Sequence, residues 1–215
     1  MELLQFLEHL DDHLILLSQQ YGYATYAILF VIIFGETGLV IAPFLPGDSL
    51  LFVAGAVAAM DASQQGTFNL PMLMVTLIAA AFLGNLLNFQ MGRWLGPKVF
   101  HWERSRLLNP RHLAEAHEFY ERHGGKTIVL SRFLPIIRTY APFVAGVGDM
   151  THSRFMAFNA LGAVLWVSSL LLAGYFFGNV PYIKGNLGAM IAGIVAVTLL
   201  PLVWAGLRAR FRKKP

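Results

Sequence analysis

Four charged residues lie within apolar stretches of this sequence, and they are its candidates for chemistry. Arg132 and Arg138 stand six residues apart in one stretch, and Glu36 and Asp48 stand in another. An arginine at bilayer depth costs about 2.5–3.5 kcal/mol on insertion scales. Such charges persist where they pair with one another or line a cavity. Because guanidinium groups donate paired hydrogen bonds to phosphate oxygens, we predict that Arg132 and Arg138 bind an anionic head group.

Two roles are open to the carboxylates of Glu36 and Asp48. They pair with the arginines when the site is empty, or one of them carries a proton that drives substrate release. The structural alternative is that all four charges form an ion-pair staple between two segments. We favour the binding role, because apolar packing could replace such a staple at little cost in stability.

Prolines and a glycine break the same two stretches. Pro46 and Gly47 directly precede Asp48, and Pro135 and Pro142 lie on either side of Arg138. Proline donates no backbone hydrogen bond and restricts the residue before it, so we predict kinked or ended helices near residues 134 and 141. We assign these residues to shaping the backbone rather than to touching the substrate.

The composition indicates an integral membrane protein. Of 215 residues, 56% are hydrophobic and 13% are charged, whereas soluble domains carry roughly 25% charged residues. The absence of cysteine excludes disulfides, a thiolate nucleophile and cysteine-based metal sites. All sixteen Lys and Arg residues lie from Arg93 onward, which is typical of membrane topology and argues against a nucleic-acid partner.

The pattern of apolar and polar runs predicts an all-α fold in a single membrane domain, residues 1–215. The first stretch is expected to be helical from Ala24 to Phe34 and interrupted at Gly35–Gly38. A helix before Gly124–Gly125 is expected to stop there. The helix at 1–20 either lies at the membrane interface or packs on the bundle. The predicted segments are an amphipathic helix at 1–20, a re-entrant hairpin at 21–60, spans at 71–94, 155–177 and 187–207, a cytoplasmic helical segment at 98–126, a second re-entrant hairpin at 127–149 and a basic cytoplasmic tail at 208–215.

Two short words recur in the two interrupted segments. Phe44-Leu45-Pro46 matches Phe133-Leu134-Pro135, and Phe52-Val53-Ala54-Gly55 matches Phe143-Val144-Ala145-Gly146. Counting charges places the two segments on opposite sides of the membrane. The combination predicts an inverted repeat whose re-entrant hairpins face each other near the midplane, the plan of many transporters.

Longer motifs cover residues from about 36 to 146. They are Glu36-Thr37-Gly38, Phe44-Leu45-Pro46-Gly47-Asp48-Ser49-Leu50, Gly92-Arg93, Phe119-Tyr120-Glu121-Arg122-His123-Gly124-Gly125-Lys126, Arg132-Phe133-Leu134-Pro135, Arg138-Thr139 and Ala145-Gly146. On these motifs the chain resembles the DedA family, also called VTT or SNARE-associated domain proteins. The resemblance implies that Glu36, Asp48, Arg132 and Arg138 are the functional charged set. It also implies a role in lipid movement across the bilayer, including undecaprenyl phosphate recycling and phospholipid scrambling, or in proton-dependent transport.

One position departs from the pattern of close relatives. Gly84-Asn85 and Phe89 stand where many relatives have Gly-Asp followed four residues later by Tyr. The change removes an acid from any proton relay that uses this position. We expect Asn85, Asn88, Gly92 and Arg93 to serve helix ends and contacts between helices.

The leading functional hypothesis is a membrane lipid transporter that recycles undecaprenyl phosphate across the bacterial cytoplasmic membrane, with proton coupling left open. The alternatives are a phospholipid scramblase, a proton-dependent small-ion transporter and a structural or partner-binding membrane protein. A membrane lipid phosphatase is a further alternative, but Arg138 occupies the position of that signature's histidine nucleophile. We expect no enzyme activity, no cofactor and no metal, and a homodimer is compatible with the sequence.

The charge distribution generates a testable topology. The tail holds Arg208, Arg210, Arg212, Lys213 and Lys214, which places the C-terminus in the cytoplasm. Counting back, a periplasmic reporter fused after Pro215 should be inactive, and one inserted within residues 62–68 should be active. The opposite pair of activities would contradict this topology.

Overall fold

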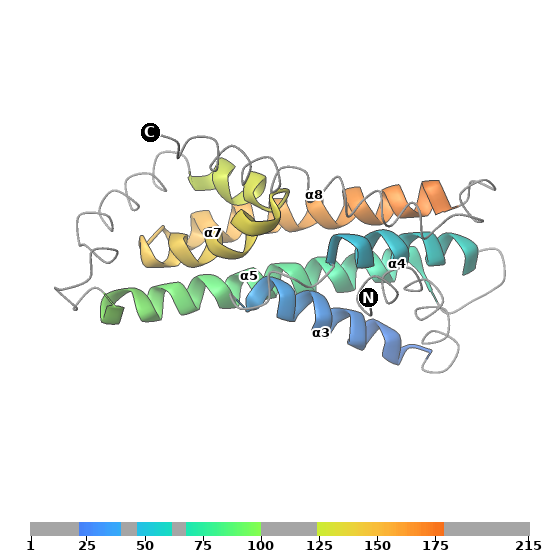
Figure 1. Ribbon diagram of the computed structural model, residues 1–215, viewed down its shortest axis with the longest axis horizontal. Coiled ribbons are helices and arrows are strands. Elements are labelled where there is room, and N and C mark those ends of the chain that lie inside the picture. The colour runs from blue at the N-terminus through green and yellow to red at the C-terminus, as the bar shows by residue number, and fades with distance from the viewer. Residues whose placement is uncertain (1–21, 40–46, 62–67, 100–123, 179–215) are drawn as a thin grey trace, which may run out of the picture. The chain divides into compact units, whose positions relative to one another are not determined.

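The computed structural model describes residues 22–39, 47–61, 68–99 and 124–178, and these residues are helical without any strand. The named helices are α3 (Ala24–Gly38), α4 (Gly47–Asp61), α5 (Leu70–Val99), α7 (Pro135–Val147) and α8 (His152–Gly178) (Figure 1). The expected all-α class is therefore confirmed. The predictions for residues 1–20, Pro46, 187–207 and 208–215 lie outside the described residues.

The chain divides into two compact units, which are described separately. One contains α4, the start of α5 up to Leu73 and the end of α8 from Leu170. The other contains α3 from Tyr26, α5 from Met74, the helical residues 124–131, α7 and α8 up to Ser169.

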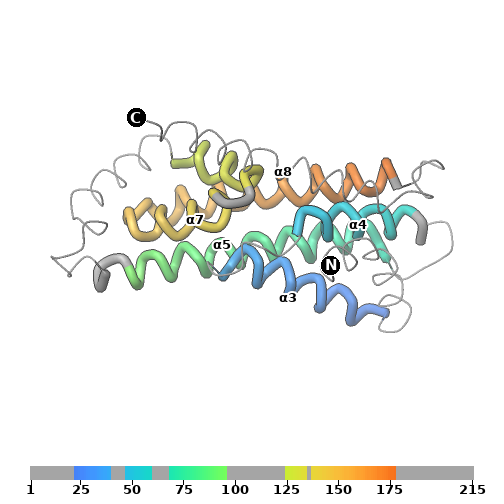
Figure 2. Tube along the Cα trace, in the orientation of Figure 1, coloured from blue at the N-terminus to red at the C-terminus, as the bar shows by residue number. Residues whose placement is uncertain are grey.

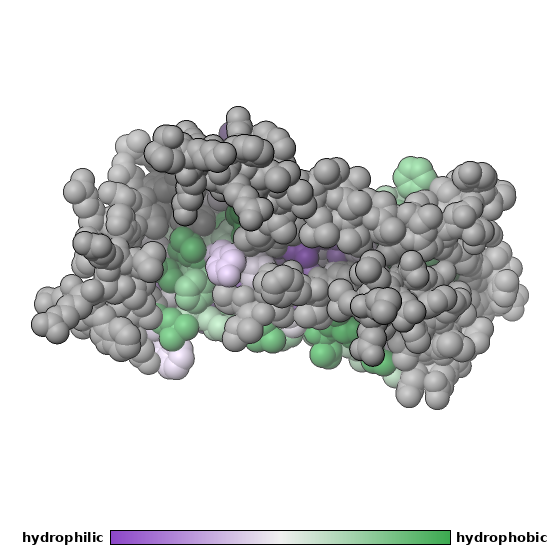
Figure 3. Space-filling model, in the orientation of Figure 1, coloured by the Kyte–Doolittle hydropathy of each residue, from purple (hydrophilic) through white to green (hydrophobic). Residues whose placement is uncertain are grey.

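Helices α5 and α8 are long and apolar enough to cross a membrane, over Leu70–Leu95 and His152–Phe177. They coincide with the helices expected at 71–94 and 155–177. Only 33% and 39% of their most apolar stretches are buried, unlike the core helix of a soluble protein. Much of the described surface in Figure 3 is accordingly apolar. Exposed apolar side chains on these helices, such as Val75 and Phe176, are suited to contact with lipid.

Residues 124–147 form two helical arms joined by a tight turn. The first arm ends at Ser131, and Phe133 and Leu134 donate backbone hydrogen bonds back to Leu130 and Ser131. Ile128 and Ala145 share one buried cluster, so the arms lie side by side, and Figure 2 shows the chain reversing between them. These residues therefore form a helical hairpin, and the re-entrant placement expected at 127–149 stays a prediction.

Only one of the two prolines in the hairpin interrupts a helix. Pro135 occupies the start of α7, where its missing N–H costs nothing, so the break expected near residue 134 is confirmed. Pro142 lies inside α7, which continues to Val147. A kink or an end of the helix was expected near residue 141, and the structure shows that the helix does not end there.

The break predicted at Gly35–Gly38 is wrong. The stop predicted at Gly124–Gly125 concerns a helix that lies outside the described residues. Helix α3 continues through Gly35–Gly38, where Gly38 lies close to the backbone of Gly84 on α5. Gly124 and Gly125 are helical, and a Cβ added to Gly125 would lie 2.2 Å from the Phe158 ring. In these places glycine permits close approach of two helices rather than a helix end.

The repeated word Phe-Val-Ala-Gly packs against a glycine-containing helix in the first unit. A Cβ added to Gly174 of α8 would lie 1.9 Å from the carbonyl oxygen of Phe52. A Cβ added to Gly55 of α4 would lie 2.1 Å from the carbonyl oxygen of Leu171. The two contacts run in opposite chain directions, so α4 and α8 cross antiparallel in backbone contact.

The second copy of the word makes the same contacts in the second unit. A Cβ added to Gly92 of α5 would lie 2.1 Å from the carbonyl oxygen of Phe143, and one added to Gly146 of α7 would lie 2.1 Å from that of Phe89. In both units the Phe of the repeated motif faces a glycine of the neighbouring helix. The Gly of the motif faces the residue three positions before that glycine. This shared pattern supports the internal repeat that the sequence indicated.

The close approaches generate a prediction about stability. Gly146→Ala and Gly174→Ala should each lower the free energy of unfolding by about 1–3 kcal/mol or more, because a methyl group would overlap a backbone carbonyl. Thermal unfolding of the purified protein in detergent would measure the loss. Gly35→Ala is the control, because nothing lies within 4 Å of its added Cβ, and it should leave stability unchanged or raise it. Equal effects at all three glycines would contradict this account of the packing.

Candidate anion-binding site

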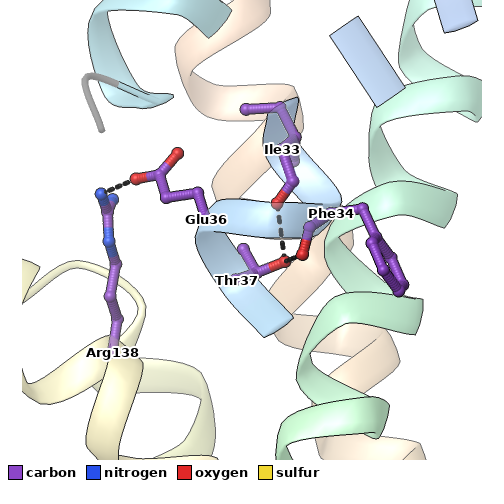
Figure 4. A network of polar contacts seen from close by, with 5 residues as sticks. All are labelled: Ile33, Phe34, Glu36, Thr37 and Arg138. Carbon is purple, nitrogen blue, oxygen red and sulfur yellow. Dashed lines mark hydrogen bonds and ion pairs between the residues drawn. The ribbon is translucent and has the colours of Figure 1, made fainter. Parts of the chain in front are cut away.

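An ion pair joins α3 to α7 inside the second unit. Arg138 donates from Nη2 to the Oε1 of Glu36, and the two side chains point toward each other in Figure 4. The Glu36 side chain is 1% exposed and that of Arg138 is 10% exposed. The sequence predicted that Glu36 and Asp48 would face the two arginines, and the structure brings Glu36 to Arg138.

Helix α3 is held in place for this pair by its contact with α5. The Thr37 hydroxyl donates to the carbonyl oxygen of Ile33 at 2.8 Å, so its polar group is satisfied within the helix. A Cβ added to Gly84 would lie 2.0 Å from that hydroxyl oxygen and 2.8 Å from the carbonyl oxygen of Phe34. The glycine therefore allows α3 to approach α5 closely and brings the neighbouring Glu36 into the interior.

Arg132 is buried without a carboxylate partner among the described residues. It is 3% exposed and follows directly after the end of the first hairpin arm. Its Nη2 donates to the side-chain oxygen of Asn159 at 2.6 Å and to the backbone oxygen of Ala81 at 3.2 Å. Its Nε finds no acceptor in the described part of the structure. The charge of Arg132 is therefore solvated by neutral dipoles and is not cancelled.

Trp166 of α8 lies beside both guanidinium groups. The Cζ atom of Arg138 is 5.4 Å from the centroid of its ring, and that of Arg132 is 6.0 Å away. Both distances are within the range of a cation–π interaction, which grows stronger when water is excluded. The buried indole, 2% exposed, thus stabilises two cations without neutralising either.

These groups surround a small, partly open cavity. It is lined by Glu36, Thr37, Asn85, Arg132, Arg138, Thr139 and Trp166. The charged residues in this lining are two arginines and one glutamate, a formal net charge of +1. A partly enclosed space with excess positive charge and free N–H donors is suited to an anion. No group of three or more potential metal-ligating side chains occurs among the described residues.

The asparagines have separate tasks here. Asn88 donates from Nδ2 to the backbone oxygen of Thr139 at 2.8 Å and to that of Thr37 at 3.4 Å, which confirms its expected role between helices. Asn85 lines the cavity, where the sequence had suggested a packing role. Asn159 and Trp166 were not predicted as site residues. The only signal for them in the sequence was an asparagine at helical spacing from a tryptophan, and such a pattern is common in membrane helices.

The remaining predicted residues lie elsewhere. Asp48 is half-buried in the first turn of α4, which Gly47 begins. It belongs to the other unit, so its place in the charged set stays a prediction. Arg93 pairs with Asp149 at 2.7 Å in a partly exposed position, as expected of a residue joining helix ends.

Comparison with known proteins assigns the chain to a family. The VTT domain matches residues 45–176, and Protein DedA of Escherichia coli K12 is 49% identical over 199 residues, covering 93% of this chain and 90% of that protein. The chain belongs to the DedA family. A Mycobacterium leprae relative, named an uncharacterized membrane protein, is 41% identical over 85% of this chain and 81% of its own length. No solved structure matches this one.

The family assignment also places the protein in a membrane. The inner membrane protein YqjA of Escherichia coli K12 is 38% identical over 73% of this chain and 69% of that protein. Relatives named as membrane or inner membrane proteins agree with the two candidate spans and the apolar surface of the described helices. The resemblance seen in the motifs is thereby confirmed at the level of the family.

The buried ion pair generates a prediction about coupling. Glu36→Gln or Arg138→Gln alone should lower the free energy of unfolding by about 3–5 kcal/mol, because each leaves a buried charge uncompensated. The double variant should recover much of that loss, since both charges are gone. A double-mutant cycle from thermal unfolding in detergent measures the coupling.

Arg93→Gln is the control for this cycle. Its ion pair with Asp149 has side chains 38% and 70% exposed, so the variant should change stability by about 1 kcal/mol or less. A double variant whose loss equals the sum of the two single losses would contradict the assigned coupling.

Proposed function

We propose that the protein moves an anionic phosphate lipid across the cytoplasmic membrane, with undecaprenyl phosphate as the substrate. The observation that carries the proposal is the excess positive charge of a buried cavity lined by Arg132 and Arg138. A buried cation without a counter-ion is costly in an apolar protein, so it indicates a partner that arrives from outside. A phosphate group supplies the missing negative charge and several acceptor oxygens.

The ion pair gives the cavity a resting state and a way to change it. When no ligand is present, the carboxylate of Glu36 offsets part of the positive charge of Arg138. A phosphate that approaches Arg138 competes with this carboxylate, and a proton on Glu36 would weaken the competition. Proton coupling through Glu36 or Asp48 is therefore part of the proposal, whereas Asn85 provides no such proton.

The proposed transport cycle depends on the membrane arrangement predicted from the sequence. The hairpin containing Arg132 and the segment from α3 to α4 are re-entrant in this proposal, and they meet near the midplane from opposite faces. The chain crosses the membrane several times with its C-terminus in the cytoplasm. In this proposal the protein acts as a transporter and not as an enzyme.

Liposomes containing the purified protein test the proposal directly. Labelled undecaprenyl phosphate should move between leaflets, and Arg132→Ala and Arg138→Ala should each reduce the rate about tenfold or more, the value of a lost charge-assisted hydrogen bond. Arg93→Ala, which removes an arginine outside the cavity, is the matched control and should leave the rate unchanged.

Labelled phosphatidylethanolamine in parallel liposomes separates the rivals. Movement of this phospholipid alone would replace the proposed function with phospholipid scrambling. Movement of the polyprenyl phosphate that survives both arginine substitutions would also overturn the proposal. A pH gradient imposed in the same assay should change the rate if Glu36 or Asp48 carries a proton.

A further inference from the structure

We propose that helix α8 makes Arg132 the fixed cationic half of the anion site, and that Asn159 is the residue that positions it. This inference rests on the proposed function and deepens it by giving the two arginines different roles. Arg138 is the exchangeable half, which the ligand shares with Glu36. Arg132 is the permanent half, whose charge no group of the described protein cancels.

The first argument is the arrangement of α8 around Arg132. Asn159, Gly162 and Trp166 are spaced by three and four residues and therefore share one face of the helix. Asn159 and Trp166 are 0% and 2% exposed. The amide of Asn159 accepts from Arg132, the ring of Trp166 lies 6.0 Å from its Cζ, and Gly162 lies against its stem. One helix face thus contacts the side chain along its length.

The second argument is that Asn159 is itself held in one orientation. Its Nδ2 donates to the carbonyl oxygen of Phe82 on α5 at 3.0 Å, so the other end of the amide, Oδ1, faces the guanidinium. An amide that is anchored at one end presents a neutral acceptor at the other. Asn159 therefore directs Arg132 without withdrawing its charge, which an aspartate in this place would do.

The third argument is the space reserved for the arginine stem. A Cβ added to Gly162 would lie 3.0 Å from Cδ and 3.1 Å from Nε of Arg132, closer than ordinary contact. The absence of a side chain at this position lets the guanidinium lie where Nε still lacks an acceptor in the described residues. The hydrogen-bonding capacity of the guanidinium is therefore not exhausted by the described protein groups.

Asn159→Asp separates positioning from simple structural support. The variant keeps the side-chain shape and an acceptor for Arg132, but it places a negative charge against the guanidinium. The change also removes the Nδ2 donor to Phe82, so a residue that only supports the fold would lose stability and keep its phosphate affinity. A residue that keeps Arg132 uncancelled would lose phosphate affinity, because the formal net charge of the cavity falls from +1 to zero.

The readout is the thermal stabilisation of the detergent-purified protein by inorganic phosphate, compared with chloride at equal ionic strength. Phosphate should stabilise the unmodified protein, and Asn159→Asp should weaken its apparent affinity for phosphate about tenfold or more. Asn69→Asp adds the same charge at an exposed position outside the cavity and should retain the unmodified affinity. Unchanged phosphate affinity in Asn159→Asp would overturn the inference, as would a lack of phosphate stabilisation in the unmodified protein.

Gly162→Ala gives an independent test without a change of charge, and it decides the matter if Asn159→Asp does not fold. The methyl group should displace the guanidinium and weaken phosphate binding, whereas Gly35→Ala should not. Equal phosphate affinity in these two alanine variants would contradict the assigned role of α8. Because this readout is binding, a protein that binds phosphate through Arg132 but moves no undecaprenyl phosphate would refute the proposed function and leave the positioning role standing.

Discussion

The guanidinium of Arg132 is held in an apolar interior by neutral groups, and the neighbouring structure is arranged to make that arrangement tolerable. A backbone oxygen from α5, an amide oxygen from α8 and the ring of Trp166 surround it. Each of these stabilises a cation, and none removes its charge. The turn that carries Arg132 ends one helix just before it and starts α7 at Pro135, so the side chain leaves the backbone where no helix confines it.

The two arginines differ in the kind of partner that stabilises their charge. Arg138 gains from a carboxylate, and removing either member of that pair strands a buried charge. Arg132 is stabilised only by dipoles and by the ring of Trp166, so its positive charge is not neutralised beside the cavity that it lines. A ligand phosphate would therefore meet the carboxylate of Glu36 at Arg138, and no carboxylate of the described residues at Arg132. Because of this difference, Arg132 attracts an anion at all times, whereas the contact of Arg138 with Glu36 can be exchanged for one with the ligand.

Close backbone approach is the second constraint on the fold. In each unit, the word Phe-Val-Ala-Gly lies in backbone contact with a helix that has a glycine at the crossing. Where apolar surface faces lipid, burial of that surface provides little drive for helices to associate, and close packing of small residues takes its place. The same reason accounts for Gly84 beside Thr37 and for Gly125 beneath Phe158. Glycines that resemble helix breaks in the sequence are contact points between helices.

The sequence by itself determined the class of protein, the apolar helices and the charged residues worth attention. Composition and hydropathy suffice for these, because charge at membrane depth is costly enough to stand out in a single chain. It also located the hairpin break at Pro135, whose missing N–H is well suited to a helix start. Only the tertiary structure decided that α3 and α7 continue through Gly35 and Pro142, because contacts with other helices outweigh local propensity. Only the tertiary structure paired Arg138 with Glu36 and gave Arg132 to Asn159, which lies 27 residues away in the sequence. Such partners depend on how the helices cross, and the residues next to Arg132 or Arg138 in the chain do not determine that crossing.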